Sequence, residues 1–110
     1  MGRFITTTGT ANVVTVTAST AYSASVNDRI LCDSTSAAFT VTLPANAGLL
    51  EGDQVQIIDV GGAFNTNNVT VGRNGSLIQE AGSDLVLDVN GAIVTLLFTG
   101  NTYGWVITSS

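Results

Sequence analysis

The sequence contains no lysine and no histidine, and it has one cysteine and one proline. Charged residues make up 10% of the 110 residues, against about 25% in an average globular protein. The usual acids and bases of enzymes are therefore scarce. The chain does not contain the histidines and cysteines that a zinc site needs, and with one cysteine it cannot form a disulfide within itself. We expect Cys32 to be a free, buried and inert thiol.

The balance of charge is acidic, with three arginines against eight acidic residues and a formal net charge of −5. Such a chain offers no basic surface for a phosphate backbone, so we expect no nucleic acid partner. Its apolar runs are far shorter than the roughly 20 residues that span a bilayer. The N-terminal stretch also lacks the apolar core of a signal peptide. We therefore expect no membrane partner and synthesis in the cytoplasm without a signal peptide.

Without histidine or lysine, a catalytic pair would have to be built from carboxylates. Nothing in the spacing of the acidic residues defines such a pair, so we predict no enzymatic activity and no cofactor. Loop carboxylates could instead hold a calcium ion, but no aspartate-rich loop with ligand spacing is present. We therefore predict no metal site. The acidic residues weighed for these roles are Glu51, Asp53, Asp59, Glu80, Asp84 and Asp88.

Apolar and polar residues alternate with a period of two along most of the chain, which is typical of half-buried strands. Asn74-Gly75 and Asn90-Gly91 suit the type I′ turns of β-hairpins, because both central residues of such turns have positive φ. The pattern predicts an all-β fold, an antiparallel β-sandwich or a barrel-like domain of short strands. We expect one domain at 12–110 after a flexible arm at 1–11. The predicted strands are 12–17, 22–26, 29–33, 38–43, 54–60, 68–72, 76–79, 85–89, 92–99 and 103–108.

Two stretches, 54–60 and 93–98, carry apolar residues at both parities. Strands of this kind are covered on both faces or contain a β-bulge. In addition, lysine is absent and Pro44 is the single proline, so little protects exposed sheet edges. These features predict a homo-oligomer, or docking on a larger assembly, that covers the free faces and edges.

Three aromatic residues, Tyr22, Tyr103 and Trp105, are candidates for a functional surface. Flat rings of this kind can stack on sugars, so they could bind a host surface glycan. Tyr103 and Trp105, however, share their parity with Ile107 near the end of a predicted strand, which is typical of core residues or of a subunit contact. Both interpretations stay open at this point.

Five short segments, in this order and spacing, resemble a β-rich module that is widespread in the virion proteins of tailed bacteriophages. The module occurs in tail fibres and spikes and in small stand-alone structural proteins of the particle. The resemblance covers the chain from about Arg29 onward. Its segments are FTVTLPA at 39–45, GDQVQIIDVGG at 52–62, NNVTV at 67–71, IVTL at 93–96 and GWVI at 104–107.

The resemblance implies a non-enzymatic virion structural protein, often a trimer. It also implies that Leu43-Pro44 ends one strand and that 59–62 turns the next strand into a wide surface loop. Because the sequence starts at Met1 and shows no shaft or coiled coil, we expect a free-standing capsid decoration, or cement, protein that bridges major capsid subunits. The alternative is a tail fibre, spike or receptor-binding module that binds carbohydrate.

The N-terminal arm is the candidate for docking on the capsid. Its threonine-rich stretch favours an extended conformation, which could add as a strand to a sheet edge of the partner. The residues proposed for this contact are Arg3, Phe4, Ile5, Thr6, Thr7 and Thr8.

Overall fold

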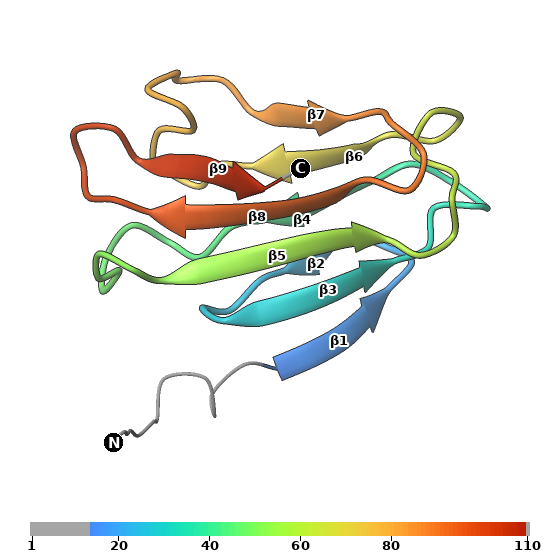
Figure 1. Cartoon of the computed structure of the whole chain (residues 1–110), viewed down its shortest axis with the longest axis horizontal. Coiled ribbons are helices and arrows are strands. Elements are labelled where there is room, and N and C mark those ends of the chain that lie inside the picture. Colours follow the sequence, from blue (N-terminus) through green and yellow to red (C-terminus); the bar gives the residue numbers. More distant parts are fainter. Residues whose placement is uncertain (1–13, 110) are drawn as a thin grey trace.

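A computed structural model describes residues 14–109 of the chain, and these residues form nine β-strands and no helix (Figure 1). The prediction of an all-β fold is therefore confirmed for this part of the chain. The strands are β1 (Val14–Ala18), β2 (Tyr22–Ser23), β3 (Asp28–Cys32), β4 (Phe39–Thr42), β5 (Gln54–Asp59), β6 (Val69–Gly72), β7 (Leu85–Leu87), β8 (Ile93–Phe98) and β9 (Trp105–Ser109).

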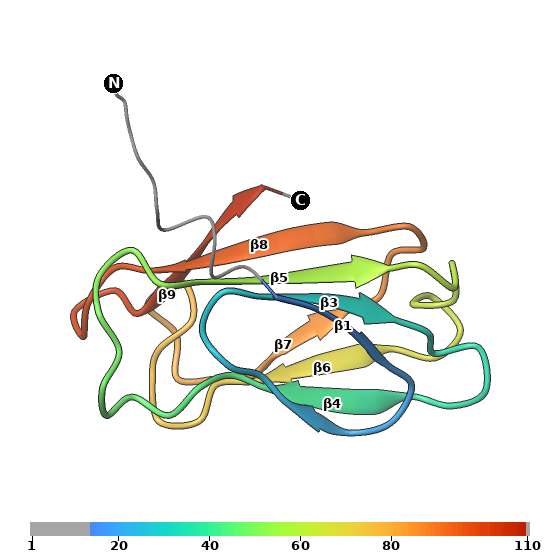
Figure 2. The ribbon, with the colours of Figure 1, turned by 90° about the horizontal axis from the view of Figure 1, so that it is seen from below.

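The strands form two mixed sheets. The five-stranded sheet has the order β1-β3-β5-β8-β9, and the four-stranded sheet has the order β2-β4-β6-β7. Figure 2 shows the sheets as two layers, with β3, β5 and β8 in one layer and β4 and β6 in the other. From β1 to β6, each strand lies in the opposite sheet from the strand before it.

This alternation explains why the prediction of an antiparallel arrangement was wrong. Four of the seven strand pairings in the described residues are parallel: β1 with β3, β3 with β5, β2 with β4, and β4 with β6. A chain that crosses to the other sheet and back returns in its original direction, so neighbouring strands of one sheet run the same way. Only β5–β8, β6–β7 and β8–β9 are antiparallel.

Nine of the ten predicted strands are present, and the exception is 76–79. This segment belongs to neither sheet and contributes only isolated bridges from Ile78 to Ala81 and to Trp105. The chain bends sharply immediately afterwards, because Gln79 and Glu80 have φ values of 54° and 64°. Left-handed backbone at two successive residues cannot continue a strand.

The two Asn-Gly pairs have different outcomes. Asn74 and Gly75 both have positive φ, at 49° and 91°, as a type I′ turn requires. The strand expected after this turn is the missing one, so the turn opens a loop. At Asn90-Gly91 the chain passes from β7 in one sheet to β8 in the other, so this turn joins the two sheets and closes no hairpin.

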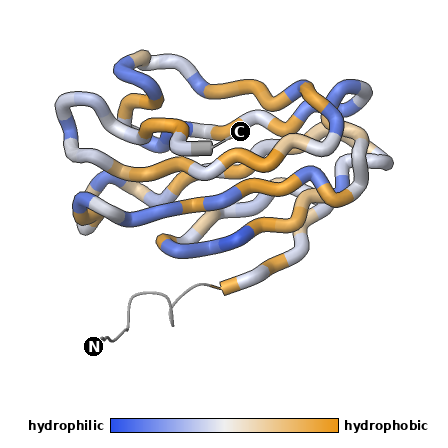
Figure 3. Tube along the Cα trace, viewed as in Figure 1, coloured by the Kyte–Doolittle hydropathy of each residue, from blue (hydrophilic) through white to orange (hydrophobic). Residues whose placement is uncertain are grey.

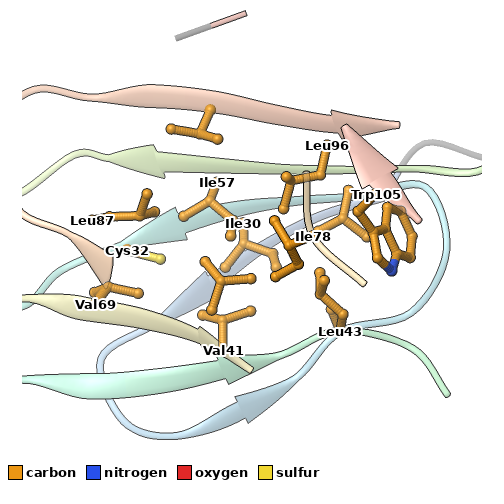
Figure 4. Close-up of a cluster of buried hydrophobic side chains, with 14 of the residues drawn as sticks. Ile30, Cys32, Val41, Leu43, Ile57, Val69, Ile78, Leu87, Leu96 and Trp105 are labelled. Atoms are coloured by element: carbon orange, nitrogen blue, oxygen red, sulfur yellow. The ribbon is translucent and has the colours of Figure 1, made fainter. Parts of the chain in front are cut away.

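The hydrophobic core lies between the sheets. Hydrophobic and hydrophilic residues alternate along the strands (Figure 3). Buried side chains from both sheets form one hydrophobic cluster. Figure 4 shows Ile30, Ile57 and Leu96 of the larger sheet pointing toward Val41 and Val69 of the smaller one. All five side chains are fully buried.

Candidate functional site

Several carboxylates accept hydrogen bonds that order the backbone around them, and Asp59 is the clearest case. Its buried carboxylate, at the end of β5, accepts hydrogen bonds from four backbone N–H groups at 2.9 to 3.3 Å. Three donors belong to the loop after β5 and the fourth is Gly91, in the turn before β8. Asp59 therefore holds this loop and this turn together. The donors are Gly62, Ala63, Phe64 and Gly91.

Two further carboxylates order loops in the same way. Asp53 accepts a hydrogen bond from the N–H of Leu50 at 2.8 Å, and Asp84 accepts one from the N–H of Arg73 at 3.0 Å. Across residues 14–109, no three side chains of acidic or cysteine type come together in a way that could hold a metal ion.

Cys32 lies at the end of β3 beside Asp59 in the register of the sheet, and its side chain is buried. Burial, together with the charge of the Asp59 carboxylate, raises the pKa of the Cys32 thiol to about 12. The thiolate, which is the reactive form, is therefore scarce at neutral pH. This agrees with the expectation of an inert thiol.

Tyr22 is half-buried on β2, where it packs against the core. Its hydroxyl donates a hydrogen bond of 2.7 Å to Asp28, which also accepts a bond from the N–H of Ser25. The hydrogen bond to Asp28, then burial and the charge of the carboxylate, raise the pKa of Tyr22 to about 12. The polar end of this ring is thus already occupied within the chain.

The structure separates the other two aromatic candidates. Trp105 is fully buried and packs edge to face on Phe98, with ring centroids 5.3 Å apart. Within the described chain it is a core residue, and its ring is not exposed at the surface. Tyr103 lies in the turn between β8 and β9 and is 52% exposed. The three rings therefore do not form one exposed aromatic face.

The proposed docking arm, from Arg3 to Thr8, lies outside the described residues, as does the whole of the expected flexible segment 1–11. The structure offers a different candidate for an interaction surface, on the five-stranded sheet. We call the side of this sheet that points away from the four-stranded sheet the outer face.

The outer face carries apolar side chains in two groups. One group runs across three strands, because Leu31 pairs with Ile58 and Ile58 pairs with Ile93. In the other group, Leu97 of β8 pairs with Val106 of β9. Ile93 is 47% exposed and the others are half-buried. No second layer of the described chain covers them (Figure 2).

The mixed parity of 54–60 and 93–98 was the sequence signal for this surface. The β5–β8 register is regular, so no bulge moves the apolar residues of β5 to the inside. A register shift does occur between β8 and β9, where Thr95 pairs with Ser109 and Leu96 pairs with Ile107, so the extra residue of this β-bulge is Thr108 on β9. The contributions of Leu31 and Val106 were missed, because short strands with one outward apolar residue look like ordinary alternation.

An apolar groove of about 580 Å³ adjoins the outer face where the chain passes from β7 to β8. Val86 and Val89, 51% and 65% exposed, lie on one side of it. Ile93 lines the groove and also belongs to the outer face, so the two apolar surfaces are continuous.

In comparisons with known proteins, no family model matches the chain, and no curated protein has significant similarity to it. Within residues 14–109, no helix has the length and apolar character needed to cross a bilayer.

Proposed function

We propose that the chain is a non-enzymatic structural protein of a tailed-bacteriophage virion. Two details of the fold agree with the resemblance in the sequence. Leu43-Pro44 directly follows the end of β4, and Asp59 is followed by a loop that reaches to β6. The roles of Asp53, Asp59 and Asp84 in ordering loops also favour a structural protein.

Within this class, we propose a capsid decoration protein with a β-sandwich fold that acts as a trimer and bridges major capsid subunits. The observation that carries this proposal is the outer face, where five apolar side chains, four of them half-buried and Ile93 exposed, have no second layer of the described chain over them. A surface of this kind is typical of protein contacts.

The size of the apolar surface indicates why many copies would be needed. Complete burial of a leucine or isoleucine contributes roughly 1.5–3 kcal/mol, and these side chains are already partly covered. Five of them supply only several kcal/mol, while association costs about 4–15 kcal/mol. A single contact would therefore be weak, and a trimer on a repeating lattice would bind through several contacts at once.

A tail or receptor-binding module is supported less well. It would require exposed aromatic rings, but Trp105 is buried and the Tyr22 hydroxyl is bound to Asp28. Among the three aromatic candidates, only Tyr103 is available to a sugar.

The proposal can be tested on particles of the phage that encodes the chain. We expect gradient-purified virions to contain the chain in a fixed ratio to the major capsid protein, measured by quantitative mass spectrometry. Particles without it should release DNA at a lower temperature. Absence from purified virions, or presence only in isolated tails, would overturn the proposal.

Two matched variants test the docking surface. Ile58→Asp places a charge on the outer face, and Thr42→Asp places one on the outward side of the other sheet. We expect Ile58→Asp to weaken cosedimentation with undecorated capsids by about tenfold or more, which corresponds to about 1.4 kcal/mol. Thr42→Asp should bind like the wild type. Equal binding of both variants would exclude the outer face.

A further inference from the structure

A polar row crosses the outer face between its two apolar groups. The register pairs Arg29 of β3 with Gln56 of β5, and Gln56 with Thr95 of β8. The side-chain amide of Gln56 donates a hydrogen bond of 3.0 Å to the Thr95 hydroxyl. The surface forms a small hollow of about 120 Å³ here, and Asn27, Gln54 and the buried Asp28 also line it.

Arg29 has a free charged group in this hollow. The other arginine of the described residues, Arg73, donates from its guanidinium to the carbonyl of Ser76 at 3.1 Å. Within residues 14–109, the exposed guanidinium of Arg29 forms no hydrogen bond or ion pair. The carboxylate of the adjacent Asp28 is engaged by Tyr22 and Ser25. An unpaired cation is thus held on one face of a protein with an excess of acids.

The donors in the hollow match a carboxylate. A guanidinium is planar and can bind both oxygens of a carboxylate at once. The side-chain amides of Asn27 and Gln54 make no hydrogen bonds within residues 14–109, so they provide further donors beside it. A hollow of about 120 Å³ is large enough to admit a carboxylate and its nearest atoms.

The surroundings favour a protein as the source of the carboxylate. Along β8, Ile93, Thr95 and Leu97 follow at intervals of two residues and place apolar, polar and apolar groups in line. An extended segment with an acidic residue between two apolar ones, at the same intervals, matches this order. The described strand residues of the outer face include no aromatic ring on which a sugar could stack.

We propose that the Arg29 hollow binds the carboxylate of an aspartate or glutamate side chain on the partner protein, and that apolar residues two positions away on the partner cover the apolar groups of the outer face. The inference rests on the proposed function, because it names the chemistry of the partner at the same docking surface. It gives the capsid contact its specificity, while the apolar groups supply most of the buried area.

Nuclear magnetic resonance of the ¹⁵N-labelled full chain can test the site with a defined peptide. The probe is the acetylated amide Leu-Ser-Glu-Ser-Leu, and its matched control carries Gln in place of Glu. We expect saturable shifts of the Arg29 side-chain N–H and of the Gln54 and Gln56 amides with the Glu peptide. Binding of the Gln peptide should be about tenfold weaker, because the charge-assisted hydrogen bonds are lost.

Two substitutions separate charge from geometry. Arg29→Gln should abolish the preference for the Glu peptide, and Arg29→Lys should retain about a third to a tenth of the affinity, because it keeps the charge without the fork. Equal shifts with both peptides, or an unchanged preference in Arg29→Gln, would overturn the inference. Glucuronate binding as tight as that of the Glu peptide would also overturn it, in favour of an acidic sugar.

The capsid experiment distinguishes this inference from the proposed function. If the chain binds capsids and Arg29→Gln binds equally well, the carboxylate site is wrong and the docking surface stands. If the chain binds no capsid but the Glu peptide binds saturably at Arg29, the carboxylate site is supported and the proposed capsid function is wrong. Arg29→Gln should unfold at the same urea concentration as the wild type, which excludes loss of the fold as the cause.

Discussion

The outward surfaces of the two sheets differ in a way that their inward surfaces do not. Both sheets bury Val, Ile and Leu residues in the common core. Outward, strands β2, β4 and β6 of the four-stranded sheet carry small residues, and β7 adds the exposed Val86. We call this side the threonine face, and its small residues are Ser23, Thr40, Thr42, Thr70 and Gly72. The outer face of the five-stranded sheet instead carries Leu31, Ile58, Ile93, Leu97 and Val106.

The difference teaches that alternation alone does not define what a sheet does. A threonine has high β-propensity and also tolerates water, so the threonine face needs no further layer. An isoleucine or leucine at the same kind of position gains stability only when something covers it. This contrast is the reason why we propose the outer face as the docking surface.

The largest expected effect comes from two adjacent isoleucines of β5. Ile57 is fully buried, whereas Ile58 is half-buried on the outer face. We expect Ile57→Ala to lower the free energy of unfolding by about 2–5 kcal/mol, because it leaves a cavity. Ile58→Ala should cost about 1 kcal/mol or less. Urea unfolding followed by Trp105 fluorescence measures both, and equal losses would show that the outer face is part of the stabilising core.

A second prediction converts the threonine face into an apolar one. Thr40 pairs with Thr70, and Thr70 pairs with Val86, so the double variant Thr40→Ile/Thr70→Ile places an apolar row across β4, β6 and β7. We expect this variant to form larger species than the wild type in sedimentation velocity at micromolar concentration. The matched Thr40→Ser/Thr70→Ser variant should behave like the wild type. Unchanged sedimentation of the isoleucine variant would contradict the contrast between the faces.

The reverse conversion should have a smaller effect on stability. In Ile58→Thr/Leu97→Thr, the outer face loses two apolar side chains and comes to resemble the threonine face. We expect the free energy of unfolding to fall by about 1–2 kcal/mol, and the hydrophobic dye ANS to bind the native protein more weakly. If dye binding stays the same, the dye must occupy the groove beside Val86 and Val89.

The smallest expected effect is a dependence of stability on pH at Asp33. This residue lies away from both faces, so the effect serves as a control. Hydrogen bonds from the hydroxyl and then the N–H of Thr35 hold the pKa of Asp33 below its ordinary value of 3.8. A lowered pKa in the folded state gives stability that is present above the unfolded-state pKa and is lost as the pH falls through the folded-state pKa. Asp33→Asn should therefore lose a little stability at pH 7 and none in strong acid. A stability difference from the wild type that does not change between pH 7 and pH 2 would contradict this origin.

The alternation of apolar and polar side chains allowed nine strands to be predicted. The pattern that marks a strand, with every second side chain pointing into the core, can be read from its local sequence. Pairing could not be predicted in the same way. The Asn90-Gly91 turn has the local chemistry of a hairpin, yet β7 and β8 lie in different sheets. Both sheets bury apolar side chains at alternate positions, so the pattern of a strand does not indicate which sheet it joins. The strand expected at 76–79 is absent because its last residue, Gln79, and the following residue, Glu80, adopt left-handed conformations that neither residue favours intrinsically.

The candidate surface was predicted only in part. Ile58 and Ile93 stood out because they lie in runs where both parities are apolar. Arg29 gave no signal, since a single charged residue in a strand is ordinary. Its significance comes from the pairing with Gln56 and from the engagement of Asp28 elsewhere, and both depend on contacts between distant parts of the chain.

The passage of successive strands between the two sheets also bears on how the protein forms. Only β8 and β9 make a short hairpin, and every parallel pair joins strands separated by a crossing to the opposite sheet and back. Each such pair closes a long loop before any hydrogen bond is gained, and topologies of this kind fold in milliseconds to seconds. The strands of the two sheets alternate along the chain up to β6, and the larger sheet is completed only by β8 and β9, the last strands of the described residues. We therefore expect the two sheets to assemble in one slow cooperative step, after the C-terminal strands have left the ribosome.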